Sequence, residues 1–339
     1  MINICVQSVQ KKASYHDLLS VLKNIEEIRI LSGPEDAEAI LLPDDEPGYI
    51  RKDPAFRQFR SKCIAISDGD HLSYYIPALY ASNFKCMLSK GRAQTVIHYL
   101  YSIENEPGKR NIWINRLKGS DFEKRWLYSF MGGSTCWTRK RLLKQYKNSS
   151  PEDVLVRGTD FYKHWNSTGN PEARSEQQRV YVETLLSSKF ALCPRGSSSS
   201  SIRLFEAMEL GCAPVVMADS WIPIEGVDWS FCLFVKESDV TRLDDIIRAH
   251  EGEWRERGAL ARRTFDETIS AAKLGALLEK QIRHLLETRN ETRERLIQTI
   301  YPLRRALDQT KAAARAALRE AVLFGYKSAG RKFPYELNR

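Results

Sequence analysis

Short runs rich in apolar and β-branched residues alternate with helical stretches along the whole chain. Helical periodicity separates the strand-like runs of the first half. These runs are Ile2–Val9, Glu27–Leu31, Ala39–Leu42, Lys62–Ser67, Asn111–Ile114 and Trp126–Phe130. In the second half, an amphipathic stretch at Ser175–Ser188 leads into the buried-strand pattern of Phe190–Cys193. Strands that alternate with helices indicate parallel sheets covered on both faces. The pattern therefore predicts an α/β fold with two such halves.

Polar breaks in this pattern set the expected domain boundaries. The stretch Lys147–Pro151 divides the two halves, and the looser run Asn166–Pro171 is an alternative position for the boundary. We therefore expect an N-terminal domain, a C-terminal domain and a tail over residues 1–148, 149–292 and 293–339.

Composition narrows the class of protein. The 339 residues are 42% hydrophobic and 28% charged, values typical of a soluble globular chain, which excludes disordered and fibrous classes. No run approaches the roughly 20 apolar residues of a membrane span, and the N-terminus lacks a secretory signal pattern, so we expect a cytoplasmic protein. The seven cysteines form no Cys-x-x-Cys pair and lie mostly in apolar runs, which predicts free buried thiols.

The net charge of +9 is concentrated near the C-terminus, where residues 293–339 hold eleven Lys or Arg and four Asp or Glu. A nucleic-acid groove needs basic residues over the folded domains, so this distribution argues against nucleic acid as a partner. After Pro302, the run Ala306–Phe324 predicts one basic amphipathic helix. Two roles stay open for it: contact with an anionic membrane surface, at the inner face of a membrane, or packing against the first domain.

The segment between the strand Phe190–Cys193 and a helix predicted from Ser201 to Leu210 carries the most specific chemistry. Ligands of open α/β sheets bind beyond the carboxyl ends of strands, where this serine-rich loop must lie. The N–H groups and positive end of the helix suit a diphosphate, and arginines add charge-assisted contacts. The candidate diphosphate-binding residues are Arg195, Gly196, Ser200, Ser201 and Arg203.

Glu206 lies three residues after Arg203, on the same face of the predicted helix, where a carboxylate can accept hydrogen bonds from ribose hydroxyls. The same residues also fit a simpler interpretation. In that case, the serines only cap the helix, and Arg203 and Glu206 form a surface salt bridge.

This segment resembles the exostosin-type glycosyltransferase family, GT47. The resemblance extends over roughly residues 120–245 and includes a weaker upstream element. The matching elements are Cys193-Pro194-Arg195-Gly196, Ser201-Ile202-Arg203-Leu204-Phe205-Glu206-Ala207, Gly211-Cys212-Ala213-Pro214-Val215, Asp228-Trp229, and upstream Phe130-Met131-Gly132 with Arg139.

The resemblance implies a GT-B fold, in which two Rossmann-like domains face each other across a cleft. It implies that the C-terminal domain binds a nucleotide-sugar, mostly a UDP-sugar in this family, and that transfer inverts the anomeric centre without a required divalent metal. We expect no cofactor beyond this donor substrate. Glu225 and Asp228 are candidates for holding the donor sugar.

The run Asp68-Gly69-Asp70-His71 follows the strand-like Lys62–Ser67. At the carboxyl end of a strand, Asp70, or else Asp68 or His71, can deprotonate the hydroxyl of an acceptor. The same side chains also suit a metal ion, although no further ligands accompany them, and an Asp-Gly pair is typical of a turn. We favour Asp70 as the base and expect no bound metal.

These features predict an enzyme, a glycosyltransferase that moves a sugar from a nucleotide donor to a saccharide or glycolipid acceptor in glycan biosynthesis. Two alternatives from other classes fit the same residues. One is a catalytically silent GT-B-like protein that binds a nucleotide or a glycan, and the other is an adaptor that acts through its basic tail.

Overall fold

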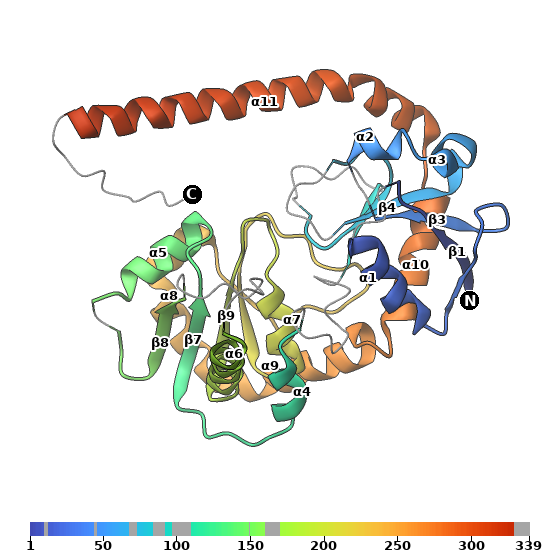
Figure 1. The fold of residues 1–339 in the computed structure, drawn as a ribbon. Helices are drawn as coiled ribbons and strands as arrows, with labels where there is room; N and C mark the ends of the chain where they lie inside the picture. The colour runs from blue at the N-terminus through green and yellow to red at the C-terminus, as the bar shows by residue number, and fades with distance from the viewer. Residues whose placement is uncertain are drawn as a thin grey trace. The chain divides into compact units, whose positions relative to one another are not determined.

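The computed structural model describes residues 1–9, 13–43, 46–67, 73–83, 92–96, 110–148, 150–159 and 170–328. The chain separates into two compact units, residues 1–289 and residues 290–339. Within the described residues, the first unit contains two parallel β-sheets and the second unit contains one long helix (Figure 1).

The first sheet has the strand order β2-β1-β3-β4-β5-β6, and every neighbouring pair is parallel. Strands β3 and β5 are buried at every position, because a parallel sheet has helices on both faces. The strands are β1 (Ile2–Val6), β2 (Ile28–Ile30), β3 (Ala39–Leu42), β4 (Cys63–Ser67), β5 (Ala78–Tyr80) and β6 (Ala93–Thr95).

Three short helices follow strands of this sheet: α1 (Ala13–Lys23), α2 (Pro47–Ile50) and α3 (Pro54–Gln58). Proline at the first helical position begins both α2 and α3, and Asp53 caps α3 by accepting a hydrogen bond of 2.9 Å from the amide of Ala55.

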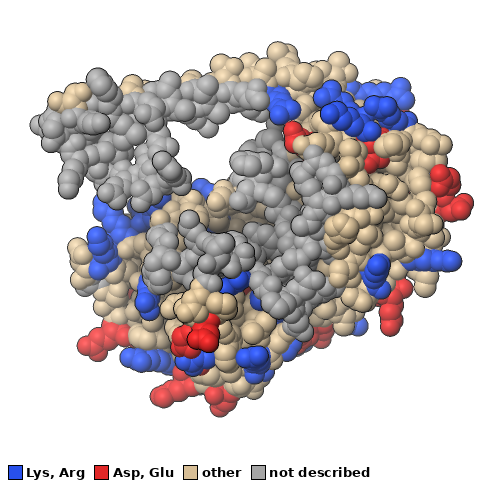
Figure 2. Space-filling view, in the orientation of Figure 1, with Lys and Arg blue, Asp and Glu red and all other residues tan. Residues whose placement is uncertain are grey.

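Basic side chains gather on the surface where α2 and α3 lie (Figure 2). We call this group the α2–α3 basic patch. None of its members forms an ion pair with a carboxylate in the described part of the chain, although several donate to backbone carbonyls. The patch consists of Arg51, Lys52, Arg57, Arg60 and Lys62.

The second sheet has the order β11-β10-β9-β7-β8, again all parallel. Its strands are β7 (Trp126–Gly132), β8 (Val154–Gly158), β9 (Ser188–Pro194), β10 (Ala213–Met217) and β11 (Leu233–Phe234). The associated helices are α4 (Ile112–Leu117), α5 (Trp137–Gln145), α6 (Pro171–Leu186), α7 (Ile202–Glu209), α8 (Leu243–Ala249), α9 (Trp254–Thr264) and α10 (Leu274–Glu287). Two parallel sheets covered by helices confirm the predicted α/β, GT-B class.

Both faces of the second sheet are covered, and successive residues of β9 point to opposite faces. Phe190 and Leu192 pack in a cluster with residues of α5 and α8, whereas Ala191 and Cys193 pack in a cluster with residues of α6, α7 and α9. The latter cluster continues into the first sheet, where it includes Ile4, so the two sheets share a core.

The sheets divide the chain earlier than predicted. We expected Trp126–Phe130 in the domain of residues 1–148, but β7 lies within the second sheet, paired with β8 and β9. The boundary between the sheets therefore lies between β6 and β7. Helix α10, placed in the domain of residues 149–292, contacts β5 and β6 of the first sheet, and Gln281 Nε2 donates to Thr95 O at 2.7 Å. Pairing of such distant segments leaves no local signal in the sequence.

One element prediction was also wrong, and another was right in kind but too short. Asn111–Ile114 is not a strand, because Asn111 Oδ1 accepts a hydrogen bond of 3.0 Å from the amide of Trp113 and begins α4. The helix predicted after Pro302 is longer and passes through that proline: α11 extends from Glu291 to Ser328. In contrast, the predicted stop of α7 is confirmed, since Gly211 has φ +69° just beyond the end of the helix.

The second unit exposes an apolar stripe on α11. Its members recur at helical spacing, and the least exposed of them, Val322, is still 39% exposed. The stripe consists of Leu296, Ile300, Leu303, Leu307, Leu318 and Val322. No helix within the described residues has an apolar run long enough to cross a membrane. The six cysteines in the described part of the chain are buried and free, as predicted.

Candidate functional site

The serine-rich loop lies between β9 and α7, at the carboxyl edge of the second sheet, as the sequence predicts. Two backbone hydrogen bonds shape it. The amide of Arg195 donates to Met217 O at 3.1 Å, which fixes the loop to the end of β10, and the amide of Gly196 donates to Ser200 O at 3.0 Å. These hydrogen bonds close the loop into a turn, and Ser201 follows that turn at the start of α7.

Helix α7 begins without a side-chain cap, although serine is a good capping residue. Ser201 occupies the N-cap position with extended backbone, and its side chain accepts no hydrogen bond from the helix. The hydroxyls of Ser198, Ser200 and Ser201 are buried and have no hydrogen-bond partner among the described residues. Buried polar groups are normally paired, so the start of α7 has the character of a site for a polar ligand.

Arg203 is the central charged residue of this site and is only 7% exposed. Its Nη2 donates to Met131 O, and its guanidinium carbon lies 4.6 Å from the centroid of the Phe130 ring and 5.5 Å from that of Tyr181. These contacts hold the side chain in place but leave Nε and Nη1, both buried, without a partner among the described residues. A fixed guanidinium with two unused donors is suited to an anion.

Gly132 makes room for this arginine. A Cβ atom at residue 132 would lie 2.9 Å from Arg203 Nη2 and 2.9 Å from the ring of Phe130. The pattern Phe130-Met131-Gly132 therefore has a physical explanation: the phenylalanine provides a ring face, the methionine a carbonyl, and the glycine the space that Arg203 occupies.

Arg139 brings a second guanidinium to the same place. Its Nε donates to Arg195 O at 2.9 Å and its Nη2 to Pro194 O at 3.1 Å, so it also supports the serine-rich loop. Burial, and then the positive charge of Arg203, lower the pKa of Arg139 to about 10. Neither Arg139 nor Arg203 forms an ion pair with a carboxylate in the part of the chain that the structure describes. An anion that binds here would relieve this repulsion.

Arg195 has a different environment from the one expected. Its Nε lies 3.1 Å from Glu237 Oε2, and the same carboxylate accepts hydrogen bonds from Thr138 Oγ1 and from the amide of Asp219. Glu237 therefore balances the charge of Arg195 and ties the loop to α5. A contact between Arg195 and a diphosphate stays a prediction.

Glu206 does not form the surface salt bridge with Arg203 that was an alternative. Its Oε2 accepts a hydrogen bond of 2.5 Å from the hydroxyl of Tyr181. Burial raises the pKa of Glu206, although the Tyr181 hydrogen bond and Arg203 oppose this shift. Tyr181 therefore connects Glu206 to Arg203 and fixes the carboxylate near the start of α7. Binding of a ribose by Glu206 stays a prediction.

The remaining candidates are not brought together with Arg203 by any contact among the described residues. Glu225 Oε2 accepts a hydrogen bond of 3.2 Å from Gln94 Nε2 of the first sheet. Asp228 accepts hydrogen bonds of 2.9 Å from the amide and hydroxyl of Ser230, which lower the pKa of Asp228 and indicate a local turn. Asp68, Asp70 and His71 lie outside the described residues.

The sequence reasoning missed three residues of this site as binding candidates: Gly132, Arg139 and Tyr181. The first two belong to the Phe-x-Gly element and its downstream arginine, so the sequence carried a signal for them. Tyr181 lies on α6 with no distinguishing pattern, and only the fold reveals its role.

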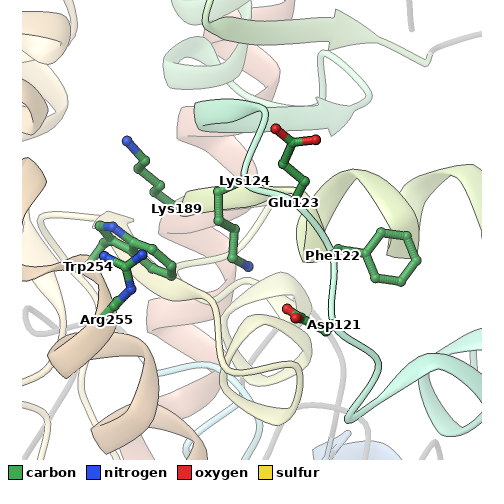
Figure 3. Close-up of a pocket in the computed structure, with 7 residues that line it drawn as sticks. All are labelled: Asp121, Phe122, Glu123, Lys124, Lys189, Trp254 and Arg255. Carbon is green, nitrogen blue, oxygen red and sulfur yellow. The ribbon is translucent and has the colours of Figure 1, made fainter.

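A separate pocket lies at the opposite ends of the strands, near the starts of β7, β9 and α9 (Figure 3). Its volume is about 440 Å³. The guanidinium of Arg255 lies 4.4 Å and the Lys124 ammonium 5.4 Å from the Trp254 ring centroid, and Lys124 also donates to Leu186 O at 2.5 Å. None of these three contacts involves a residue of the serine-rich loop. The pocket is lined by Asp121, Phe122, Glu123, Lys124, Lys189, Trp254 and Arg255.

The described residues contain no group of three or more His, Cys, Asp or Glu side chains arranged to hold a metal ion.

Residues 90–250 match the family model of the Exostosin GT47 domain. This part of the chain is therefore similar to the exostosin GT47 family. The match includes β6, the whole second sheet, the serine-rich loop, Arg139 and Arg203. The resemblance expected from the sequence is therefore confirmed, over a longer range than the motifs alone covered.

Relatives of this domain occur in animals and plants. An exostosin-1 homolog of Caenorhabditis elegans is 28% identical over 157 residues, which are 43% of this chain and 40% of that protein. A probable glucuronosyltransferase of Oryza sativa subsp. japonica is 39% identical over 87 residues, 24% of this chain and 20% of that protein. The chain thus spans less than half the length of each of these relatives.

Among solved structures, the chain is similar to AviGT4, a glycosyltransferase involved in avilamycin A biosynthesis. The identity is 9% and the TM-score is 0.39, over 85% of this chain and 98% of that structure.

Proposed function

We propose that this protein is an exostosin GT47 glycosyltransferase of glycan biosynthesis. It transfers a sugar from a nucleotide-sugar, in our proposal a UDP-sugar, to a saccharide or glycolipid acceptor. Relatives named as exostosins and as probable glucuronosyl- and xylosyltransferases support this class of reaction. We propose that the reaction inverts the anomeric centre and needs no divalent metal.

The observation that carries the proposal is the buried guanidinium of Arg203, with Nε and Nη1 unpaired among the described residues. During transfer, the bond between the anomeric carbon and the diphosphate oxygen breaks, and negative charge grows on the departing diphosphate. Arg203, Arg139 and the uncapped start of α7 supply positive charge where this develops, in surroundings that exclude water. The fold holds these groups in place before the substrate arrives, so little reorganisation is needed.

The acceptor hydroxyl attacks the opposite face of the anomeric carbon and must lose its proton. We assign the proton to Asp70, with Asp68 and His71 as alternatives, because these residues follow β4 directly in the sequence. The carboxyl end of β4 lies beside that of β5, and the segment after β5 contacts the serine-rich loop through Ser82 and Ser199. This proximity of β4 and β5 to the serine-rich loop supports our assignment of the base to the segment that follows β4.

The test compares Arg203→Lys with the wild-type protein in a panel of UDP- and GDP-sugars, with release of nucleotide as the measurement. Lysine keeps the charge but not the fork of donors, so we expect turnover to fall at least about tenfold. Arg110→Lys is the matched control, since Arg110 is another largely buried arginine, bonded to Glu209 at 2.6 Å. Equal turnover in Arg203→Lys and wild type would contradict the proposal.

Two further arms examine the finer points. Asp70→Asn is expected to abolish transfer while it leaves binding of the nucleotide unchanged, and binding without any transfer in the wild type would favour the silent binding protein. Addition of EDTA is expected to leave turnover unchanged, and the anomeric configuration of the product reports inversion or retention.

We also propose that the protein contacts an anionic membrane surface. Two observations support this: the exposed apolar stripe on α11, and the α2–α3 basic patch of the first unit. Each feature belongs to one unit, the patch to residues 1–289 and the stripe to α11.

A further inference from the structure

Ser82 and Asn83, which follow β5 of the first sheet, bond directly to the serine-rich loop. Ser82 Oγ lies 3.0 Å from Ser199 Oγ, and Ser199 Oγ donates to Asn83 O at 2.5 Å. The amide of Ser200 donates to Ser82 Oγ at 2.9 Å. All four residues are buried, and the contact joins segments more than a hundred positions apart in the sequence.

The Ser200 amide lies immediately before the N-cap residue of α7, in the region where the proposed donor diphosphate binds. Its acceptor in this structure is a neutral hydroxyl. An anionic oxygen is a stronger acceptor for an N–H group at a helix start, because charge-assisted hydrogen bonds are about twice as strong as neutral ones. Nearby, the hydroxyls of Ser200 and Ser201 and two nitrogens of Arg203 have no partner among the described residues. Ser82 therefore accepts the hydrogen bond of one donor, the Ser200 amide, at a site whose other donors have no partner among the described residues.

We propose that the Ser82 hydroxyl occupies the position of a phosphate oxygen and must be displaced when the donor binds. This inference rests on the proposed donor site. Displacement breaks the hydrogen bonds that join Ser82 to Ser199 and Ser200, so binding of the nucleotide loosens this contact between the two sheets. When the nucleoside diphosphate leaves, Ser82 returns to the Ser200 amide. Ser82 thus lowers the affinity for the nucleotide and favours product release.

The test measures the dissociation constant for uridine diphosphate by calorimetry in wild type, Ser82→Ala and Ser82→Asp. Alanine removes the competing hydroxyl, and one neutral hydrogen bond corresponds to a two- to tenfold change, so we expect uridine diphosphate to bind about two- to tenfold more tightly. Aspartate places a carboxylate beside the same amide, and we expect binding to weaken at least about tenfold. Inorganic pyrophosphate as a second probe is expected to give the same order of affinities.

Ser129→Ala is the matched control, because Ser188 Oγ donates to Ser129 Oγ at 2.7 Å in a buried hydroxyl pair of the second sheet. Its affinity for uridine diphosphate is expected to equal that of the wild type. An unchanged or weaker affinity in Ser82→Ala, beside measurable binding by the wild type, would overturn the role of Ser82 alone. No binding by the wild type and by Ser82→Ala would instead remove the donor site, and the inference with it.

Discussion

At the scale of single residues, the position of Arg203 depends most directly on Gly132. A Cβ at residue 132 would meet Arg203 Nη2 and the Phe130 ring, each at 2.9 Å, which is closer than side chains pack. We expect Gly132→Ala to displace the guanidinium and to reduce affinity for a nucleoside diphosphate about tenfold or more, since hydrogen bonds to charged groups contribute about 1.5–3 kcal/mol. Overpacking of this kind also costs about 1–3 kcal/mol of stability. Calorimetric titration and urea denaturation measure the two effects.

The chain offers a matched control for this substitution. A Cβ at Gly48 in α2 would have no atom within 4 Å, so Gly48→Ala should change neither nucleotide affinity nor stability by more than a small amount. If Gly132→Ala binds the nucleotide as tightly as the wild type, the explanation of the Phe-x-Gly element by the packing of Arg203 is wrong.

At the scale of elements, local patterns predicted what local forces determine. Helix α7 was predicted between the serine-rich loop and Gly211, and Gly211 does follow its end in a conformation that favours glycine. The run Asn111–Ile114 misled the prediction, because its β-branched residues favour a strand. There, a side-chain cap and a buried contact to α6 determine the structure. The sequence also identified Arg203 as a candidate. It did not reveal that Arg195 forms an ion pair with Glu237, which lies 42 positions further along the chain.

Asn111 is the residue on which α4 depends. Its Oδ1 caps the helix through the amide of Trp113, and its Nδ2 donates to Gln178 O at 3.0 Å in α6. Asn111→Ala should lower the free energy of unfolding by about 1–3 kcal/mol, because it removes a cap and the additional hydrogen bond to Gln178 O, which keeps its partner within α6. Asn111→Asp keeps the cap and loses only the donor, so its stability should lie between alanine and wild type. Urea denaturation measures this order, and equal losses for the two variants would show that the cap contributes nothing.

At the scale of the whole molecule, the alternation of strands and helices was enough to predict two parallel sheets. The boundary between the sheets was not predictable, because β7 pairs with β9 across more than fifty residues and α10 returns to β5 and β6. The candidate site shows the same division. On the second sheet, Arg195 to Glu206 lie in one continuous motif, and Gly132 and Arg139 in a second. Ser82 and Asn83 reach the site from the first sheet without any sequence signal.

The membrane proposal is also a property of the whole molecule, because it combines the α2–α3 basic patch with the apolar stripe of α11. A basic side chain near an anionic bilayer contributes about 1 kcal/mol, or about fivefold in partition, and this attraction is screened by salt. We therefore expect co-sedimentation with vesicles that contain phosphatidylglycerol, and little with phosphatidylcholine alone. Arg51→Gln with Arg57→Gln should weaken binding about twentyfold, and Leu303→Ser with Leu307→Ser should weaken it even at low salt, because the apolar contribution is not screened.

The matched control removes two exposed cations from elsewhere on the first unit, Lys23→Gln with Arg29→Gln. These lie outside the patch, so this variant should bind vesicles like the wild type. If the control variant and the patch variant lose vesicle binding equally, net charge alone drives binding. If the wild type binds neutral vesicles as tightly as anionic ones, the basic patch does not contribute to binding. Because vesicle binding and nucleotide affinity are measured separately, a failure of the membrane proposal leaves the donor site at α7 unaffected.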